Sequence, residues 1–237
     1  MAQGDAASGL PLGPVVDATP ARRPQPVSMQ GRYGSVQRLC LEHSAALWHA
    51  LAGSDVVWTY MGYGPFADER AFSDWLASRI ALEDPYSYAV VDGSGRALGI
   101  ATLMEVRPAM RVIEVGNILY APALQRTALG TEAQYLLAYY AFETLGYRRY
   151  EWKCNALNAA SRRAATRYGF VFEGVLRQHM ISKGRSRDTA YYSMLEQEWP
   201  SCKASFERWL APGNFDAAGK QRTTLGALNA AAGERRS

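Results

Sequence analysis

The sequence predicts a mixed α/β fold of the α+β type, with a mostly antiparallel central sheet and helices on both of its faces. Short runs of alternating or β-branched apolar residues recur along the chain, and runs with helical spacing separate some of them. The resulting order is β, α, α, three β, α, β, α, β and β. Because several strands follow one another without an intervening helix, this order indicates a mixed sheet and not a regular doubly wound one.

The composition predicts one folded domain with a tail at each end. The chain has 237 residues, of which 48% are hydrophobic and 20% charged, which is sufficient for one core. Residues 1–30 are rich in Pro, Gly and Ala without helical or strand periodicity, so we expect them to be disordered. We expect the domain to span residues 31–199. In residues 200–237 a helical segment precedes a polar, alanine-rich end, which predicts an appended helix and a frayed tail.

The first half of the domain contains a strand, two helices and a hairpin. Residues 33–39 alternate like a strand, and LEHSAALWHALAG then has the pattern of a helix closed by Gly53. A second helix is predicted over residues 67–82, after the aromatic loop SDVVWTYMGYGPF. The segment SYAVVDGSGRALGIATLMEV predicts two strands joined by a DGSG turn.

The second half continues the alternation of strands and helices. The predicted elements are a strand over residues 111–120, a long helix ending at Gly146, a strand at YEWKCN, a helix at NAASRRAATRY, a strand at FVFEGVLRQHMI and a closing hairpin around KGRSRD and TAYYSML. No internal repeat is visible.

The charge and cysteine content narrow the class of protein. Cys40, Cys154 and Cys202 are widely spaced and form no metal pattern, which favours a reducing compartment. No signal peptide or membrane-spanning run is visible, so we expect a cytoplasmic protein. Residues 121–190 contain eleven Lys and Arg against five Asp and Glu, a balance of 11 − 5 = +6 that favours an anionic ligand, although a solvated basic face or a nucleic-acid surface would also fit.

The loop ALQRTALGTEA joins the strand-like run VIEVGNILY to a helix-like run. The first turn of a helix presents unpaired N–H groups and the positive end of the helix dipole, so such a junction can bind phosphate. A simple strand-to-helix turn is the alternative, because the loop contains only one glycine.

Two motifs and the order of elements together resemble the GCN5-related N-acetyltransferase (GNAT) family, and within it the branch of ribosomal-protein N-acetyltransferases. The motifs are QRTALGT before a long helix and NAASRRAATRYGFVFEG, and the resemblance covers residues 31–199. In this family the loop reads Gln/Arg-x-x-Gly-x-Gly/Ala, and Gln125, Ala128 and Gly130 occupy the defining positions. Ala128 replaces a glycine, which is acceptable if its φ is negative at the helix entrance.

The resemblance implies a binding site for acetyl-CoA and no metal. Backbone N–H groups of the loop would bind the pyrophosphate, and the residues implied there are Gln125, Arg126, Thr127, Ala128, Leu129, Gly130 and Thr131. A strand splayed from its neighbour would offer the backbone of Ile118 and Tyr120 to the pantetheine arm. Asn158 and Ser161 match the Asn-x-x-Ser of the branch and would contact the same arm. Helix capping is the alternative role for Asn158.

The candidate catalytic base is Glu114. The period of two along residues 111–120 predicts that Glu114, Gly116, Ile118 and Tyr120 share a face, where partial burial would raise the pKa of the Glu114 carboxyl. A carboxylate paired across the sheet is the alternative. The position of the tyrosine general acid in many family members is Ala165 here, so water or another hydroxyl is left to protonate the thiolate.

Several other residues have two open interpretations. Cys154 would lie beside the cofactor and could accept an acyl group, although a buried small side chain is the favoured role. Trp58, Tyr60 and Tyr63 could line an acceptor site or simply pack the loop that contains them.

The resemblance implies an N-acetyltransferase that moves the acetyl group of acetyl-CoA to a primary amine in a ternary complex. The acceptor would be a protein N-terminus or a small amine, with no nucleic acid or membrane as partner. The alternatives are a non-catalytic acyl-CoA-binding module of the same fold and, less favoured, a nucleic-acid-binding domain. The sequence does not determine the oligomeric state.

Overall fold

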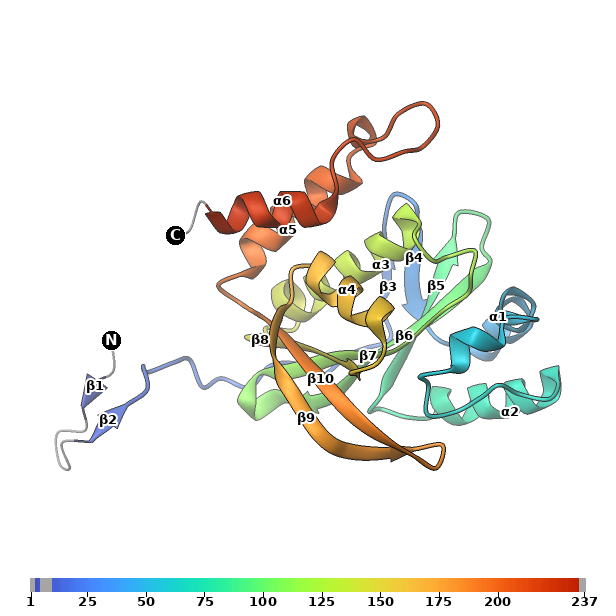
Figure 1. Cartoon of the computed structure of the whole chain (residues 1–237), viewed down its shortest axis with the longest axis horizontal. Helices are drawn as coiled ribbons and strands as arrows, with labels where there is room; N and C mark the ends of the chain where they lie inside the picture. Colours follow the sequence, from blue (N-terminus) through green and yellow to red (C-terminus); the bar gives the residue numbers. More distant parts are fainter. Residues whose placement is uncertain (1–2, 5–9, 235–237) are drawn as a thin grey trace.

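The computed structural model describes residues 3–4 and 10–234 (Figure 1). The strands are β1 (Gln3–Gly4), β2 (Pro11–Leu12), β3 (Ser28–Gln30), β4 (Gly34–Arg38), β5 (Tyr86–Asp92), β6 (Ala97–Arg107), β7 (Val112–Tyr120), β8 (Arg149–Asn155), β9 (Val171–Ser182) and β10 (Arg185–Leu195). The helices are α1 (Ser44–Leu51), α2 (Glu69–Ile80), α3 (Ala128–Tyr139), α4 (Ala159–Arg167), α5 (Trp199–Leu210) and α6 (Leu225–Glu234). The predicted helices and strands of the domain are therefore present close to their expected positions.

One sheet of eight strands forms the centre of the molecule, in the order β3-β4-β5-β6-β7-β8-β10-β9. All neighbours are antiparallel except β7 and β8, which are parallel. The connection between these two strands contains α3, as a parallel connection requires a crossover. The prediction of a mixed, mostly antiparallel sheet is confirmed.

Helices cover the sheet on both faces, and each face has its own apolar core (Figure 1). Successive residues of β5 point to opposite faces, so Tyr88 joins the core beneath α3 and α5, whereas Ala89 joins the core beneath α1 and α2. Figure 1 shows that α1 and α2 lie over only one end of their face. The part of this face near β7, β8 and β10 is therefore left without a helix.

The amino-terminal segment is more ordered than the sequence predicted. Residues 28–30 form β3, which pairs with β4. Ala21 and Arg22 donate backbone hydrogen bonds to the carbonyls of Pro108 and Leu145, at 3.1 and 2.9 Å. Backbone pairing of this kind leaves no periodic pattern of side chains, which explains why the prediction of disorder to residue 30 was wrong for this part. Residues 1–2 and 5–9 lie outside the described residues.

The carboxyl-terminal segment is also structured through residue 234. Helix α5 packs on α3, and Phe206 and Trp209 are buried in the main core. Helix α6 packs on α5 and α4, and buries Leu225 and Leu228 in the same core. The prediction of an appended helix is supported by α5, whereas the prediction of a frayed end was wrong because this helix finds an apolar surface to cover. Residues 235–237 lie outside the described residues.

Candidate active site

Strands β7 and β8 separate part-way along their length and open a gap in the sheet. Their parallel pairing runs only from Val112–Val115 on β7 to Arg149–Trp152 on β8. Beyond it, residues 116–120 pair only with β6, and residues 153–155 pair only with β10. The predicted splayed strand is therefore present, and Ile118 and Tyr120 lie along it.

A β-bulge at Asn117 changes the direction of the side chains along β7. Asn117 has a φ of 48°, and Asn117 and Ile118 together lie opposite the single residue Ala101 of β6. Side chains at even-numbered positions therefore point to one face of the sheet before the bulge and to the opposite face after it. Glu114 lies on the same face as α1 and α2, in the part that no helix covers, whereas Tyr120 packs beneath α3 on the other face. The prediction that Glu114, Ile118 and Tyr120 share one face was wrong for this reason.

The loop before α3 presents four backbone donors without partners. Thr127 caps the helix by accepting a hydrogen bond from the Gly130 N–H at 3.0 Å, and its carbonyl accepts from the Thr131 N–H at 3.3 Å. Within residues 10–234, the N–H groups of residues 126–129 make no hydrogen bond. These four donors at the positive end of the helix dipole suit an anion.

The residues of this loop are held by specific contacts. Arg126 has the left-handed φ of 61°, whereas Ala128 begins the helix with a negative φ, so an alanine is tolerated there. A Cβ on Gly130 would lie 2.7 Å from the Leu124 carbonyl oxygen, so this close approach requires glycine. Gln125 donates to the Tyr120 carbonyl at 2.9 Å, which ties the loop to the splayed strand. The Tyr120 carbonyl therefore already accepts a hydrogen bond within the protein.

Asn158 and Ser161 both lie at the start of α4, and both already have partners. The Asn158 side chain caps the helix by accepting from the Ser161 N–H at 3.0 Å. The Ser161 hydroxyl accepts from the Trp152 indole at 3.0 Å. The capping alternative is therefore present, and contact with a cofactor remains a prediction for both residues.

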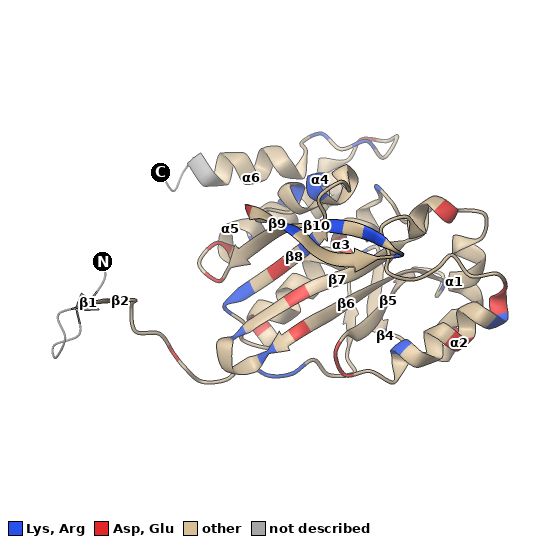
Figure 2. Ribbon diagram, turned by 60° about the horizontal axis from the view of Figure 1, so that its bottom comes forward, with Lys and Arg blue, Asp and Glu red and all other residues tan. Residues whose placement is uncertain are grey.

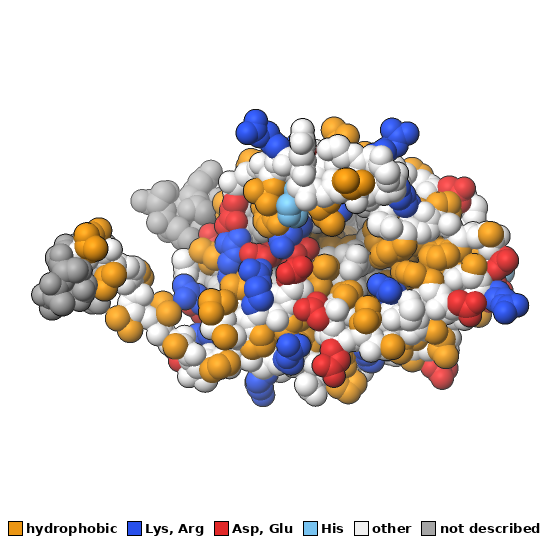
Figure 3. Space-filling model, turned by 90° about the horizontal axis from the view of Figure 1, so that it is seen from below, with side chains coloured by type: hydrophobic (Ala, Val, Ile, Leu, Met, Phe, Trp, Pro, Cys, Tyr) orange, Lys and Arg blue, Asp and Glu red, His pale blue; other side chains and the backbone are white. Residues whose placement is uncertain are grey.

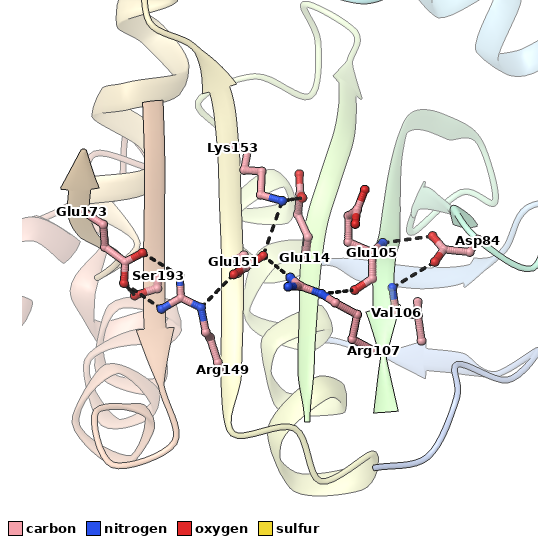
Figure 4. Close-up of polar contacts among 10 residues, drawn as sticks. All are labelled: Asp84, Glu105, Val106, Arg107, Glu114, Arg149, Glu151, Lys153, Glu173 and Ser193. Atoms are coloured by element: carbon pink, nitrogen blue, oxygen red, sulfur yellow. Dashed lines mark hydrogen bonds and ion pairs between the residues drawn. The ribbon is translucent and has the colours of Figure 1, made fainter. Parts of the chain in front are cut away.

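Glu114 belongs to a row of alternating charges that crosses the sheet (Figure 4). The Lys153 ammonium lies 2.9 Å from Glu114 and 3.5 Å from Glu151. Glu151 is also paired with Arg107 and Arg149, at 2.5 and 2.7 Å. Glu114 and Glu151 are each only 5% exposed, so these pairs compensate charges that the fold removes from water.

Burial and pairing act in opposite directions on the carboxyl of Glu114. Loss of water raises its pKa to about 7, although the nearby Lys153 ammonium acts to lower it. The pKa of Glu151 is instead lowered, because its bonds to Arg149, Lys153 and Arg107 together outweigh the effect of burial. One carboxyl in this row can therefore gain and lose a proton near neutral pH.

The face that carries this row is open to solvent and recessed. Figure 2 shows positions of Lys, Arg, Asp and Glu following one another along the ribbons of β6, β7 and β8. Figure 3 shows this face hollowed near its centre, with charged side chains gathered beside the hollow. Glu114 lies beneath this face, with 5% of its surface exposed.

The loop between α1 and α2 (residues 52–68) closes a ring around this region. The Tyr60 hydroxyl donates to the Leu157 carbonyl at 3.2 Å, which links the loop to the connection between β8 and α4. The Lys183 ammonium, at the turn of the β9–β10 hairpin, donates to the carbonyls of Trp58 and Gly64 at 2.9 and 2.6 Å. The ring thus brings three segments that are far apart in sequence to the opening between β7 and β8.

Comparison with known proteins identifies the fold and the family together. Residues 36–171 match the sequence model of the acetyltransferase (GNAT) domain. The chain belongs to the GNAT family. It is accordingly an acetyl-CoA-dependent acyltransferase, and the family resemblance seen in the two motifs is confirmed.

Individual GNAT relatives support this assignment along most of the chain. A GCN5-related N-acetyltransferase from Brucella melitensis is 42% identical, with a TM-score of 0.88 over 90% of this chain and 99% of that one. A probable GNAT-family acetyltransferase from Chromobacterium violaceum is 44% identical, with a TM-score of 0.76 over 81% of this chain and 98% of that one. The Bacillus subtilis protein YdaF, whose name describes it as a putative ribosomal N-acetyltransferase, is 30% identical over 55% of this chain and 70% of its own length.

Several expectations for this GNAT chain concern side chains inside the fold. Ala165 is fully buried, so the position of the family tyrosine offers no hydroxyl. Cys154 is buried, and burial raises the pKa of its thiol, as expected for a packing residue. Trp58 packs within an aromatic cluster and is 3% exposed, so packing is its role. Tyr63 packs against the Trp75 ring in a tilted arrangement, at a centroid distance of 4.6 Å.

Sequence reasoning missed Lys153 and Lys183. The alternation of YEWKCN places Lys153 on the same face as Glu151, but its contact with Glu114 depends on the register of two parallel strands. Lys183 lies in a hairpin turn with φ 49°, where a lysine normally extends into solvent. Among the described residues there is no group of His, Cys, Asp and Glu arranged to hold a metal ion, and no helix long and apolar enough to cross a membrane.

Proposed function

We propose that this protein transfers the acetyl group of acetyl-CoA to a primary amine by direct attack in a ternary complex. The observation that carries the proposal is the arrangement around β7. The gap beside this strand has four unpaired N–H groups at one end, from residues 126–129, and the carboxyl of Glu114 on the open face of the sheet. An anionic cofactor and an amine would thus approach the same strand from two directions.

The residues of the loop fit the phosphates of coenzyme A. Backbone N–H groups of Arg126, Thr127, Ala128 and Leu129 would hold the pyrophosphate, and the backbone of Ile118 would pair with the pantetheine arm in the gap. Asn158 and Ser161 would border that arm from α4. Bound acetyl-CoA supplies a thioester carbonyl that a neutral amine can attack.

Glu114 would make the amine neutral. An ammonium group entering from the open face would give its proton to the Glu114 carboxylate, directly or through water, and the pKa of about 7 suits this exchange. The new N–C bond forms as the C–S bond breaks. We assign protonation of the departing thiolate to water, because Ala165 has no ionisable group.

The hydrogen-bonded ring around the opening favours a protein N-terminus or a small amine as the acceptor. The hydrogen bonds of Tyr60 and Lys183 hold the loop of residues 52–68 across the face from which the amine must enter. A protein N-terminus or a small amine would pass through such an opening more readily than a side chain on a folded surface. The ribosomal acceptor in the name of YdaF is consistent with the first of these.

The cofactor loop can be tested with two substitutions at one position. Ala128→Asp places a carboxylate in the first turn of α3, which is favourable for the helix but repels phosphate, so coenzyme A affinity should fall roughly tenfold or more. Ala128→Gly should bind coenzyme A nearly as well as the parent. Calorimetry measures both affinities, and unchanged affinity in a folded Ala128→Asp protein would contradict the proposed loop.

Turnover is tested with a panel of acceptors. Release of free thiol from acetyl-CoA should depend on an added amine, and the panel should contain peptides with free N-termini, amino acids, polyamines and amine drugs. Ala165 also fits the alternative of a non-catalytic acyl-CoA-binding module. Tight coenzyme A binding without amine-dependent thiol release across the panel would favour that alternative.

A further inference from the structure

We propose that the acceptor carries a carboxylate in addition to its amine, and that Arg79, Tyr63 and Asn117 bind this carboxylate. This inference rests on the proposed function and names the class of its acceptor. It follows from a cavity between α2 and the sheet that is lined in part by Asn117 of β7, the strand that also carries Glu114.

The cavity lies between α2 and the sheet and has a volume of about 10 Å³, which is room for roughly one water molecule. Tyr63, Arg79 and Asn117 contribute the polar groups that matter here. The remaining lining residues are Leu39, Trp75, Pro85, Ser87, Ile100 and Thr102. Asn117 is the bulge residue of β7, so the cavity adjoins the gap in which the cofactor is proposed to bind.

Three of the polar side chains that line the cavity are hydrogen-bond donors with few or poor acceptors. Within residues 10–234, Arg79 forms no ion pair, and its guanidinium donates only to Ser78 Oγ, at 3.2 Å. The Tyr63 hydroxyl makes no hydrogen bond in the same part of the chain. The Asn117 amide nitrogen has only long contacts, 3.4 Å to Thr102 Oγ1 and 3.6 Å to Met104 Sδ.

Donors that converge without acceptors favour an anion. A guanidinium group binds a carboxylate through two parallel N–H···O bonds, and a phenol and an amide can donate to the same oxygens. The cavity has room for about one oxygen atom, so a carboxylate would place one oxygen inside it, whereas the three outer oxygens of a phosphate group would not fit.

The cavity and Glu114 are connected along the sheet. Met104 pairs with Glu114 across β6 and β7, and its sulfur is the atom that Asn117 contacts. A Cβ on Gly116 would lie 2.5 Å from that sulfur and 3.2 Å from Glu114 Oε1, so glycine lets the Met104 side chain pack over this stretch of β7. A ligand with one end at Glu114 and the other at Arg79 would lie across Met104.

The two ends of this stretch carry opposite charges. The carboxylate of Glu114 receives the amine, and the guanidinium of Arg79 receives an anion. A compound with an amine at one end and a carboxylate at the other matches both, whereas a polyamine would place a second cation beside Arg79. The acceptor class is therefore an amino acid, or a peptide whose first residues include a carboxylate.

The experiment compares matched acceptors that differ in charge at one end. We suggest 4-aminobutanoate against 1,4-diaminobutane, and L-glutamate against L-glutamine, with thiol release as the readout. The parent should prefer the carboxylate-bearing member of each pair by about tenfold or more in kcat/KM. Arg79→Gln should abolish this preference by raising KM, and Arg79→Lys should restore part of it. Arg70→Gln, an exposed residue of α2 paired with Asp74, is the matched control.

Binding provides a readout that does not depend on turnover. Calorimetry with the coenzyme A-loaded protein should show 4-aminobutanoate binding that Arg79→Gln weakens, with coenzyme A affinity unchanged. Selective binding of the amino acid without any turnover would support this inference and count against the proposed function. Equal or better use of the diamines, or an Arg79→Gln variant that keeps the parental preference, would overturn the inference.

Discussion

Glu114 carries a carboxyl group that the fold removes from water and places 2.9 Å from the Lys153 ammonium. Burial raises its pKa to about 7, so the fraction in the basic form increases as pH rises through this value. Turnover should therefore fall on the acid side of about pH 7 if this carboxylate accepts the proton of the amine.

Glu114→Gln tests this role while preserving the shape of the side chain. Turnover should fall by roughly 10²–10⁴ and coenzyme A affinity should hardly change, because the amide cannot accept a proton. Glu69→Gln, at an exposed glutamate of the first turn of α2, removes the same charge and serves as the control. If Glu114→Gln keeps near-parental turnover on a genuine acceptor, with the same acid limb in its pH–rate profile, then Glu114 has a structural role.

Glu173 contributes to stability in a pH range set by its pairing. Hydrogen bonds from Arg149 and then Ser193 lower its pKa to about 2, so its stabilising effect is present above about pH 4.5 and is lost as pH falls toward 2. Glu173→Gln should lower the free energy of unfolding by up to about 1 kcal/mol at pH 7, because the pair is partly exposed to solvent. Urea unfolding of parent and variant should converge near pH 2, and a constant difference across the range would contradict this account.

At the level of single elements, the bulge of β7 determines which groups face the gap. Asn117 holds a φ of 48°, which asparagine and glycine tolerate better than a β-branched residue does. Asn117→Val should therefore lower the free energy of unfolding by about 1–2 kcal/mol and weaken coenzyme A binding. Asn117→Gly should keep both near the parental values. If the valine variant binds coenzyme A like the parent, the bulge does not shape the cofactor site.

The elements show where sequence patterns succeed and where they fail. Helix α2 and the β5–β6 hairpin follow from periodic apolar residues and from turn chemistry, such as Asp68 capping α2 and Asp92 accepting from Ser94 and Arg96. The bulge at Asn117 inserts one residue, which a period of two cannot reveal. The position of the loop before α3, between a strand and a helix N-terminus, was predictable from local patterns, whereas the pairing of Glu114 with Lys153 depends on long-range register.

At the level of the whole molecule, the carboxyl-terminal segment completes the main core. Leu225 of α6 is fully buried, whereas a Cβ added to Gly226 would extend into open space. Leu225→Ala should lower the free energy of unfolding by about 2–5 kcal/mol through loss of apolar contact. Gly226→Ala should raise it by up to about 1 kcal/mol through helix propensity. Urea unfolding measures both, and an unaffected Leu225→Ala protein would show that α6 does not contribute to the core.

The sheet consists of two halves that are joined by the short parallel pairing of β7 and β8. Strands β3–β7 and strands β8–β10 are joined by register pairs at only four positions, Val112–Val115 with Arg149–Trp152. A ligand bound beyond the last of these pairs would contact both halves of the sheet and hold them together. We therefore expect amide hydrogen exchange at these four positions to slow when coenzyme A binds. In that case the cofactor stabilises the sheet of the enzyme as well as taking part in its reaction.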